Sequence, residues 1–345
     1  MFLGSRVSIK DIARAAGVSH STVSRSLSDS LLVNPETKAR IQQLAQQSGY
    51  SPHAGARSLV MGRTRTIGVV VTTIADPFVA EVVQGIESAA YQHDYTVILA
   101  TSGAEPEREI AAVKMLRSKR VDGVIITSSR IGALYQDDLE RVGVPVVLIN
   151  DHSSQGRQYT GSISVDNRHG GRLATQHLIS RGHRRIAHIA GPEGHSSSAD
   201  RLAGYRQAVA GAGLPEDPAL VQSGDGLAAS GQRAVDVLLR QAESPTAVFC
   251  YNDMTAIGLL VAARERGLVL PRDLSVVGFD DIPFAAFVFP ALTTIAQPKF
   301  DMGQRALAMV LALVKAGDTA RYTVADVIVQ GNLVVRQSTA APVAR

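Results

Sequence analysis

The sequence contains a single cysteine, Cys250, which excludes an internal disulfide and a cysteine-rich metal site. This cysteine ends the apolar run Ala247–Cys250, where we expect a buried, unreactive thiol. No apolar run approaches the roughly 20 residues of a membrane-spanning helix. The first residues, Met1–Arg6, also lack the apolar core of a secretory signal. These absences predict a globular protein of the cytoplasm.

The common signatures of enzymes are also missing. The sequence has no Gly-x-x-x-x-Gly-Lys-Ser/Thr phosphate loop, and Gly224-Asp225-Gly226 is not followed by a third glycine at the dinucleotide-binding spacing. None of the nine histidines shows the spacing of metal ligands. We therefore expect no catalytic residues, no cofactor and no metal site, and an enzyme on a doubly wound fold becomes the weakest interpretation.

Residues 7–28 predict two short helices joined by a tight turn. Ser8 and Asp11 have the spacing of a capping box at the start of the first helix. An apolar stripe then recurs at helical spacing through Ile9, Ile12, Ala13 and Ala16. Gly17 supplies the turn, because glycine tolerates the left-handed conformation that ends many helices.

The second helix is predicted to begin after Ser19, with Val23 and Leu27 facing inward and polar side chains facing outward. This pattern is typical of a helix-turn-helix whose second helix enters the major groove of DNA. An ordinary helical hairpin with a solvated polar face would show a similar pattern. Asn34-Pro35-Glu36 then predicts the start of a third helix, with a cap, a proline at the first position and an acid in the first turn.

The charge distribution favours the DNA-binding interpretation. Residues 1–60 contain seven Lys or Arg and three Asp or Glu, a net charge of +4, and the whole chain also has a net charge of +4. The basic excess therefore lies in the predicted head, where phosphates would be bound. The predicted DNA-binding residues of the head are Ser8, Ser19, His20, Ser21, Thr22, Ser24, Arg25 and Asn34.

From residue 66 onward, short β-branched runs alternate with helical patterns. The predicted strands are Ile67–Val71, Thr96–Leu99, Gly123–Ile126, Pro145–Ile149, Ile186–Ala190, Ala247–Cys250 and Leu274–Gly278. The predicted helices between them include 79–93, 106–119, 168–181, 199–212, 229–242 and 254–267. Strands that are apolar on both faces and alternate with helices indicate parallel sheets covered by helices on both sides.

Ligands of open α/β sheets bind beyond the carboxyl ends of the strands. The candidate effector-binding residues are Asp76, Phe78, Asp151, Ser197, Arg201, Asn252 and Asp280. Carboxylates, amides and an arginine can hydrogen-bond vicinal hydroxyls, and one aromatic ring can stack on a sugar. Structural roles compete with this interpretation: Asp166, Asn167 and Asp253 could cap helices, and Arg201 could pair with Asp200 or Asp280.

Several motifs carry a family resemblance along nearly the whole chain. Those of the head and the segment after it are Ile9-Lys10-Asp11-Ile12-Ala13, Gly17-Val18-Ser19, Thr22-Val23-Ser24-Arg25, Tyr50-Ser51-Pro52 and Ala56-Arg57-Ser58-Leu59. Those of the body are Arg181–Ile186, Arg201–Tyr205, Asn252-Asp253, Val277–Asp281 and Pro290–Ile295. Together they resemble the LacI/GalR family of bacterial transcription regulators.

The resemblance implies a small all-α helix-turn-helix head (1–50), a hinge (51–65) and a two-lobed α/β body (66–345) like the periplasmic binding proteins. We expect three crossings between the lobes, near Asp166, Leu292 and Val324. The first lobe then comprises about 66–165 and 293–324, and the second about 166–292 and 325–340.

The resemblance also implies how DNA and effector are bound. The hinge of family members folds into a short helix on the operator and wedges a leucine into the minor groove, so Ala56, Arg57 and Leu59 are further DNA-binding candidates. The counterparts of Phe78, Arg201, Asn252 and Asp280 lie against the effector. We expect a homodimer on a near-palindromic operator, and no tetramer, because residues 338–345 carry no leucine repeat.

The expected effector is a sugar or a polyol. The resemblance implies that purine-binding members of the family have an aromatic residue that stacks on the base. At the corresponding positions this chain has Gly224-Asp225-Gly226-Leu227. Loss of that stacking wall disfavours a flat base. The favoured function is an effector-controlled transcription regulator, most simply a repressor. The alternative is an extracellular-type sugar-binding protein without DNA function, which would need neither the head nor its basic charge.

Overall fold

The computed structural model of the chain describes residues 7–27, 30, 32–50, 63–127, 143–150, 160–316 and 326–343. The chain divides into two compact units, Met1–Arg65 and Thr66–Arg345, and each unit has its own hydrophobic core. Within the described ranges, no helix is both long and apolar enough to cross a membrane.

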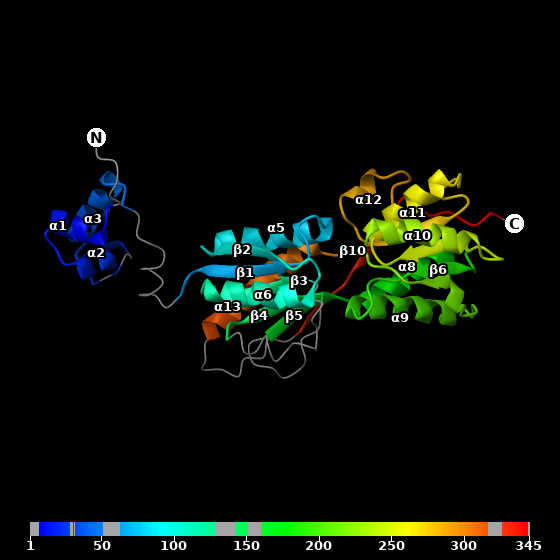
Figure 1. The fold of residues 1–345 in the computed structure, drawn as a ribbon, viewed down its shortest axis with the longest axis horizontal. Coiled ribbons are helices and arrows are strands. Elements are labelled where there is room, and N and C mark those ends of the chain that lie inside the picture. Colours follow the sequence, from blue (N-terminus) through cyan, green and yellow to red (C-terminus); the bar gives the residue numbers. More distant parts are fainter. Residues whose placement is uncertain are drawn as a thin grey trace. The chain divides into compact units, whose positions relative to one another are not determined.

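The first unit is a three-helix head made of α1 (Ile9–Ala16), α2 (His20–Leu27) and α3 (Pro35–Gln47). Its core is formed by the residues that the helical spacing predicted: Ile12, Ala13, Ala16, Val23 and Ile41 are all buried. Figure 1 shows the three helices at the blue end of the chain.

The turns of the head follow from local hydrogen bonds. The backbone N–H of Ser8 donates to the carboxylate of Asp11 at 3.0 Å, and Gly17 has a φ of 63° at the end of α1. Ser19 Oγ accepts a hydrogen bond from the backbone N–H of Thr22, and Asn34 Oδ1 accepts one from that of Glu36. These caps satisfy N–H groups that the first turn of a helix leaves without partners.

The first lobe of the second unit is a six-stranded parallel sheet. Its strands, in spatial order, are β11 (Val327–Val329), β5 (Thr160–Val165), β4 (Val146–Ile149), β3 (Gly123–Thr127), β1 (Thr66–Val71) and β2 (Thr96–Thr101). Alternate residues of β1 face opposite layers: Ile67 and Val69 pack with α5 (Pro77–Gln92) and α13 (Lys299–Ala316), whereas Val70 packs with α6 (Pro106–Ser118). Both faces are therefore buried, as parallel sheets require.

The second lobe is a six-stranded sheet with one antiparallel edge. Its order is β12 (Asn332–Val334), β10 (Thr293–Ala296), β9 (Ser275–Asp280), β8 (Ala247–Cys250), β6 (Ile186–Ile189) and β7 (Val221–Gln222), and β12 runs against β10. One face packs against α8 (Asn167–Ser180) and α9 (Ser196–Gly211), and the other against α10 (Ala228–Leu239) and α11 (Asp253–Glu265). A single-turn 3-10 helix (Pro218–Leu220) precedes β7, and a short helix, α12 (Phe284–Phe287), follows β9. Figure 1 shows the two sheets with their covering helices.

The chain passes between the lobes three times, and two crossings differ from the expected positions. The first falls at Asp166, between β5 and α8. The second lies at 297–298 instead of near Leu292, because β10 pairs in parallel with β9 and so belongs to the second lobe. The third lies at 330–331 instead of near Val324, because β11 pairs with β5 in the first lobe. The lobe ranges expected from the sequence are therefore wrong for both of these strands.

Candidate functional site

The surface of α2 carries the predicted base-reading side chains. His20, Ser21 and Arg25 are exposed, while Val23 of the same helix is completely buried. Ser24 and Thr22 lie at its margin with intermediate exposure. This helix thus has one buried apolar side and one polar side, which is the arrangement of a recognition helix.

Three other predicted DNA-binding residues of the head serve its own structure. Ser8 bonds Asp11, Asn34 caps α3, and the Ser19 hydroxyl lies within 2.7 Å and 2.9 Å of the Ser21 and Thr22 hydroxyls. All three are exposed at the amino ends of helices, where free N–H groups also attract phosphate. We expect these residues to act in DNA binding by positioning the backbone N–H groups beside them.

Arg25→Ala is expected to weaken the preference of the chain for its operator over scrambled DNA. Loss of one good bidentate contact to guanine costs about 1–3 kcal/mol of discrimination. The measurement is a competition titration with both DNAs, and Arg14→Ala on the exposed part of α1 is the matched control. Unchanged discrimination in Arg25→Ala would remove this residue from the base-reading set.

Four predicted site residues lie outside the described residues. They are Ala56, Arg57 and Leu59 of the hinge and Asp151 after β4.

A cavity of about 710 Å³ lies between the two lobes of the body. Its walls come from the carboxyl ends of strands in both sheets, including Asp76 after β1, Asn150 after β4, Tyr251 after β8, Asp280 at the end of β9 and Gln297 after β10. The size falls in the range of small-molecule sites. The described effector-binding candidates Asp76, Phe78, Ser197, Arg201, Asn252 and Asp280 all line it.

Arg201 is held in place by the protein itself. It is 3% exposed, its Nε donates to Asn167 Oδ1 at 2.9 Å, and its Nη1 donates to the Tyr251 carbonyl oxygen at 2.6 Å. The guanidinium also lies 3.6 Å from the centre of the Phe279 ring. Its Nη1 is 3.8 Å from Asp280 Oδ1, so the predicted pairing is with Asp280, while Asp200 pairs with Arg168. The arginine therefore presents a fixed donor to the cavity.

Asp280 is buried and has an unusual backbone conformation. Its φ is 118°, in the region that favours glycine, and it is the last residue of β9 before the chain turns. Residues held in such conformations cluster at functional sites. Its carboxylate accepts a hydrogen bond from Gln297 Nε2 at 2.7 Å, and its carbonyl oxygen accepts one from Lys299 Nζ at 2.6 Å. Gln297 lies in the crossing segment and Lys299 begins α13 of the first lobe, so this corner joins the lobes.

Asp76 and Phe78 begin α5 on the opposite wall. Asp76 Oδ1 accepts a hydrogen bond from the backbone N–H of Phe78 at 2.9 Å, so the aspartate is also the cap of this helix. Phe78 is only 5% exposed and belongs to the apolar core of the first lobe. Its capacity to stack on a ligand is therefore smaller than the sequence predicts.

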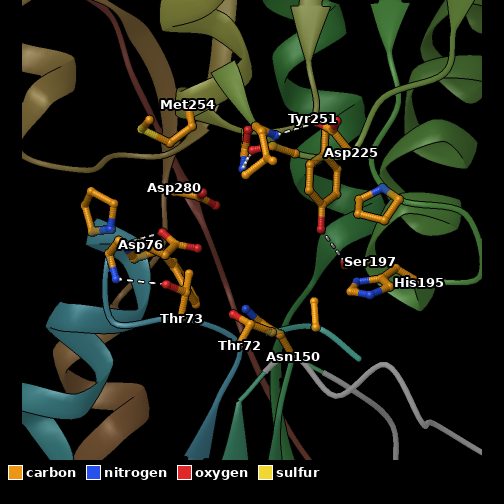
Figure 2. A pocket seen from close by; sticks show the side chains of 18 of the residues that line it. Thr72, Thr73, Asp76, Asn150, His195, Ser197, Asp225, Tyr251, Met254 and Asp280 are labelled. Atoms are coloured by element: carbon orange, nitrogen blue, oxygen red, sulfur yellow. Dashed lines mark hydrogen bonds between the residues drawn. The ribbon is translucent and has the colours of Figure 1, made fainter. Parts of the chain in front are cut away.

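Asn252 and Ser197 organise the far wall. Asn252 caps α11 by accepting from the backbone N–H of Thr255, and its amide donates to the Gly226 carbonyl oxygen at 2.9 Å. Ser197 Oγ lies 2.9 Å from the Tyr251 hydroxyl, as Figure 2 shows. Asp253, a proposed helix cap, instead accepts hydrogen bonds from the backbone N–H of Ile282 and the hydroxyl of Thr294.

Tyr251 and Gln297 are two of the cavity residues that are absent from the set predicted from the sequence. Tyr251 corrects the premise that the cleft has only one aromatic wall, because its half-buried ring lines the cavity beside Ser197. The position directly after the β8 run was the available signal for Tyr251. Gln297 was missed because the crossing was expected earlier in the chain.

The pKa values of the carboxyl groups in and beside the cavity are shifted. Burial raises the pKa of Asp280 to about 7, Arg201 opposes this increase, and the negative charge of Asp76 adds to it. Burial also raises the pKa of Asp76, and burial together with the charge of Asp280 raises that of Asp253. Carboxyl groups shifted in this way, inside a cleft, are typical of functional sites.

The raised pKa of Asp280 predicts a pH dependence of stability. The folded chain keeps the Asp280 proton up to about pH 7, whereas the unfolded chain releases it near 3.8. The stabilisation from this proton is therefore complete below pH 3.8 and is lost as the pH rises to about 7. Asp280→Asn is expected to flatten the decline of the unfolding free energy over that interval, measured by denaturant titration. Curves parallel to those of the native chain, or an equal flattening in the exposed variant Asp94→Asn, would contradict the assignment.

Comparisons with known proteins agree with this architecture. The family described as "Bacterial regulatory proteins, lacI family" matches residues 8–53, and "Periplasmic binding proteins and sugar binding domain of LacI family" matches residues 64–333. The HTH-type transcriptional repressor PurR of Vibrio atlanticus (strain LGP32) is 36% identical over 314 residues, which cover 90% of this chain and 92% of that protein.

Two solved structures share the fold over nearly the whole chain. A lac repressor dimer bound to operator and the anti-inducer ONPF is 29% identical with a TM-score of 0.85, and the match covers 98% of this chain and 100% of that one. A complex of the transcriptional regulator CelR with cellobiose is 33% identical with a TM-score of 0.72, covering 96% and 100%.

The head, the two-lobed body and the family matches to both parts give one conclusion. A sugar-binding protein without DNA function would lack the segment that matches at residues 8–53. The chain therefore belongs to the LacI family of bacterial regulatory proteins, and it is a DNA-binding transcription regulator rather than an enzyme.

Proposed function

We propose that this chain is a cytoplasmic repressor that binds a near-palindromic operator as a homodimer and changes its operator affinity when a small effector enters the cleft of the body. The observation that carries this proposal is the pairing, in one chain, of a polar recognition helix with a 710 Å³ cavity walled by both lobes. Two recognition helices are needed because one short helix reads too few base pairs for specificity.

The effector class that the cleft supports best is a polyhydroxylated small molecule. Asp280 and Arg201 offer a carboxylate and a guanidinium side by side, a combination that binds vicinal hydroxyls. Tyr251 offers a ring on which the apolar side of a sugar could pack. The comparison with the regulator solved with cellobiose is consistent with this class.

The lobes are connected in a way that suits control by a ligand. Lys299, at the start of α13, donates to the carbonyl oxygens of Asp280 and Asp281 at 2.6 Å and 2.7 Å. It also lies 3.6 Å from Glu81 of α5. A ligand that moves Asp280 therefore acts directly on helices of the first lobe, and this lobe is the part of the body that follows the hinge in sequence. Differential affinity of the ligand for two lobe arrangements would shift the equilibrium between them.

The test is a titration of the DNA upstream of the gene with the full chain, with scrambled DNA as control. Ligand candidates come from a thermal-shift panel of sugars and polyols, because a ligand of the folded state raises Tm. We expect retardation of the upstream DNA and a change of at least several-fold in its affinity when the stabilising ligand is added. Retardation without any change in affinity would refute control by the cleft.

The assembly prediction is a dimer in solution. Sedimentation equilibrium at micromolar concentration is expected to give twice the chain mass of 36.5 kDa. A mass of four chains would contradict the absence of a tetramer, and a monomer that still binds the operator specifically would contradict the two-helix requirement.

A further inference from the structure

The wall of the cleft has more acidic than basic side chains. Among the described residues that line it, four are acids and one is an arginine: Asp76, Glu105, Asp225 and Asp280 against Arg201. Asp225 and Glu105 pair with Arg233 and Arg108 at 3.1 Å and 3.6 Å. The carboxyl groups of Asp76 and Asp280 remain, and an anionic ligand placed between them would be repelled in a partly desolvated site, where Coulomb interactions are stronger than in water.

The single arginine does not offset this repulsion for an incoming anion. Arg201 is 3% exposed, donates to Asn167 and to the Tyr251 carbonyl oxygen, and lies between the Tyr251 and Phe279 rings at 4.5 Å and 3.6 Å. It also pairs with Asp280 at 3.8 Å. Its positive charge is thus already largely compensated by groups of the protein.

Two of the acids come from different lobes. Figure 2 shows the carboxyl groups of Asp76, from the first lobe, and Asp280, from the second, directed toward the same part of the cavity. Gln297 lies beside them: its amide nitrogen donates to Asp280, and it is only 5% exposed. Its Oε1 atom is buried and, among the residues that the structure describes, has no hydrogen-bond partner. This corner therefore offers three acceptor groups beside the Arg201 guanidinium, which already donates to Asn167 and to the Tyr251 carbonyl oxygen.

The donor count of the ligand group decides which chemistry suits this corner. A hydroxyl brings one donor together with two lone pairs, so it donates to only one of these acceptor groups and itself needs a donor. An ammonium group brings three donors, no acceptor and a positive charge. Its three donors match in number the three acceptor groups of this corner, which are the carboxyl groups of Asp76 and Asp280 and Gln297 Oε1.

The geometry points to an amine-bearing effector, such as an amino sugar, whose protonated nitrogen bridges Asp76 and Asp280 and draws the two lobes together. Anionic relatives such as sugar phosphates are rejected. This inference rests on the proposed function only in that the ligand is the effector; the binding site itself does not depend on DNA binding.

The electrostatics of this corner agree with the assignment. Burial raises the pKa of both Asp76 and Asp280, and Asp76 further raises that of Asp280, so the two groups resist ionising together. Arg201 and Lys299 are the cations that lower the pKa of Asp280. The Lys299 ammonium is already bound by the carbonyl oxygens of Asp280 and Asp281 and lies near Glu81. A bound ammonium ligand would favour the ionised form of both carboxyl groups.

The first experiment uses ethanolamine as a fragment probe, because it carries the ammonium without requiring a particular sugar stereochemistry. Tm of the full chain is measured at neutral pH in ethanolammonium chloride and in sodium chloride of equal ionic strength. We expect ethanolammonium to raise Tm by about 2–4 °C at several times its Kd.

The rise should vanish in Asp76→Asn, which keeps a good helix cap, and in Asp280→Asn. The exposed variant Asp94→Asn should respond like the native chain. Equal Tm in the two salts, or an equal rise in the Asp76→Asn and Asp280→Asn variants, overturns the proposal.

The second experiment compares glucosamine, galactosamine and mannosamine with their parent sugars and the corresponding 6-phosphates in the same assay. At least one amino sugar should stabilise the chain more than its parent, and no phosphate should exceed its parent. A phosphate that stabilises most, or no response to any amino sugar, overturns the proposal. The operator titration is read separately: stabilisation by amines without specific DNA binding would refute the proposed function and leave the ligand chemistry standing.

Discussion

Arg201→Ala is expected to lower the free energy of unfolding of the body by about 3–5 kcal/mol. The substitution leaves Asp280 buried without its cation, and it removes hydrogen bonds to Asn167 and to the Tyr251 carbonyl oxygen. Urea denaturation followed by circular dichroism measures the loss. Arg168→Ala is the matched control, because Arg168 also pairs with an aspartate, but on the surface with 55% of its side chain exposed. Surface pairs contribute only about 0–1 kcal/mol.

Because Arg201→Ala is expected to destabilise the body, it is a poor test of the effector role of Arg201. The sequence alone suggests that the alanine variant would lose the effector response and keep operator binding. Because Arg201 supports the lobe as well, Arg201→Lys is the better variant: it keeps the charge but cannot bond two partners while stacked between two rings. We expect this variant to bind the operator and to lose its response to the effector. A normal response in Arg201→Lys, or a loss no larger in Arg201→Ala than in Arg168→Ala, would show that the cleft has been misassigned.

Gly204→Ala is expected to destabilise the second lobe by about 1–3 kcal/mol or more. A Cβ at Gly204 would lie 2.1 Å from the carbonyl oxygen of Arg168, and one at Gly171 would lie 2.4 Å from that of Arg201. Both contacts are with backbone, so α8 and α9 would have to move apart. The displacement would carry Arg201 away from Asp280, and ligand affinity should fall together with stability.

Gly211→Ala on the same helix is the control for that prediction. Nothing lies within 4 Å of a Cβ at Gly211, so the alanine variant should be neutral or more stable by up to about 1 kcal/mol. Thermal unfolding of the two variants separates the close helix approach from the general effect of replacing glycine in a helix. Similar Tm values for both would contradict the role assigned to the Gly204 contact.

The head could be predicted from sequence because its determinants are local. Helical spacing identified Ile12, Ala16 and Val23 as core, and turn chemistry identified Gly17 and Asn34. Each of these signals acts within a few residues. The tertiary structure adds little that could override them.

The body was predictable only where strands are continuously apolar. β5 reads Thr-Gly-Ser-Ile-Ser-Val, and no strand was expected there, because its buried Ser162 is stabilised by a hydrogen bond to Asp326, 164 residues away. The same dependence on distant partners displaced the second and third crossings, since strand pairing decides to which lobe β10 and β11 belong.

The candidate site followed from one general property of parallel sheets. Residues just after strand ends converge, so Asp76, Asn252 and Asp280 could be selected from the sequence. Their individual roles could not. That Asn252 is committed to a helix cap and to the Gly226 loop depends on contacts that only the folded chain reveals.

One chain is expected to couple operator binding by the head to ligand binding in the cleft. The most direct measurement is fluorescence anisotropy of labelled upstream DNA titrated with the full chain, with and without the ligand identified by thermal shift, for the native chain and for Arg201→Lys. We expect the native chain to bind this DNA more tightly than scrambled DNA. Addition of the ligand should change the Kd for this DNA at least several-fold in the native chain and leave it unchanged in Arg201→Lys. Equal Kd values for upstream and scrambled DNA, or the same ligand effect in both proteins, would contradict this coupling.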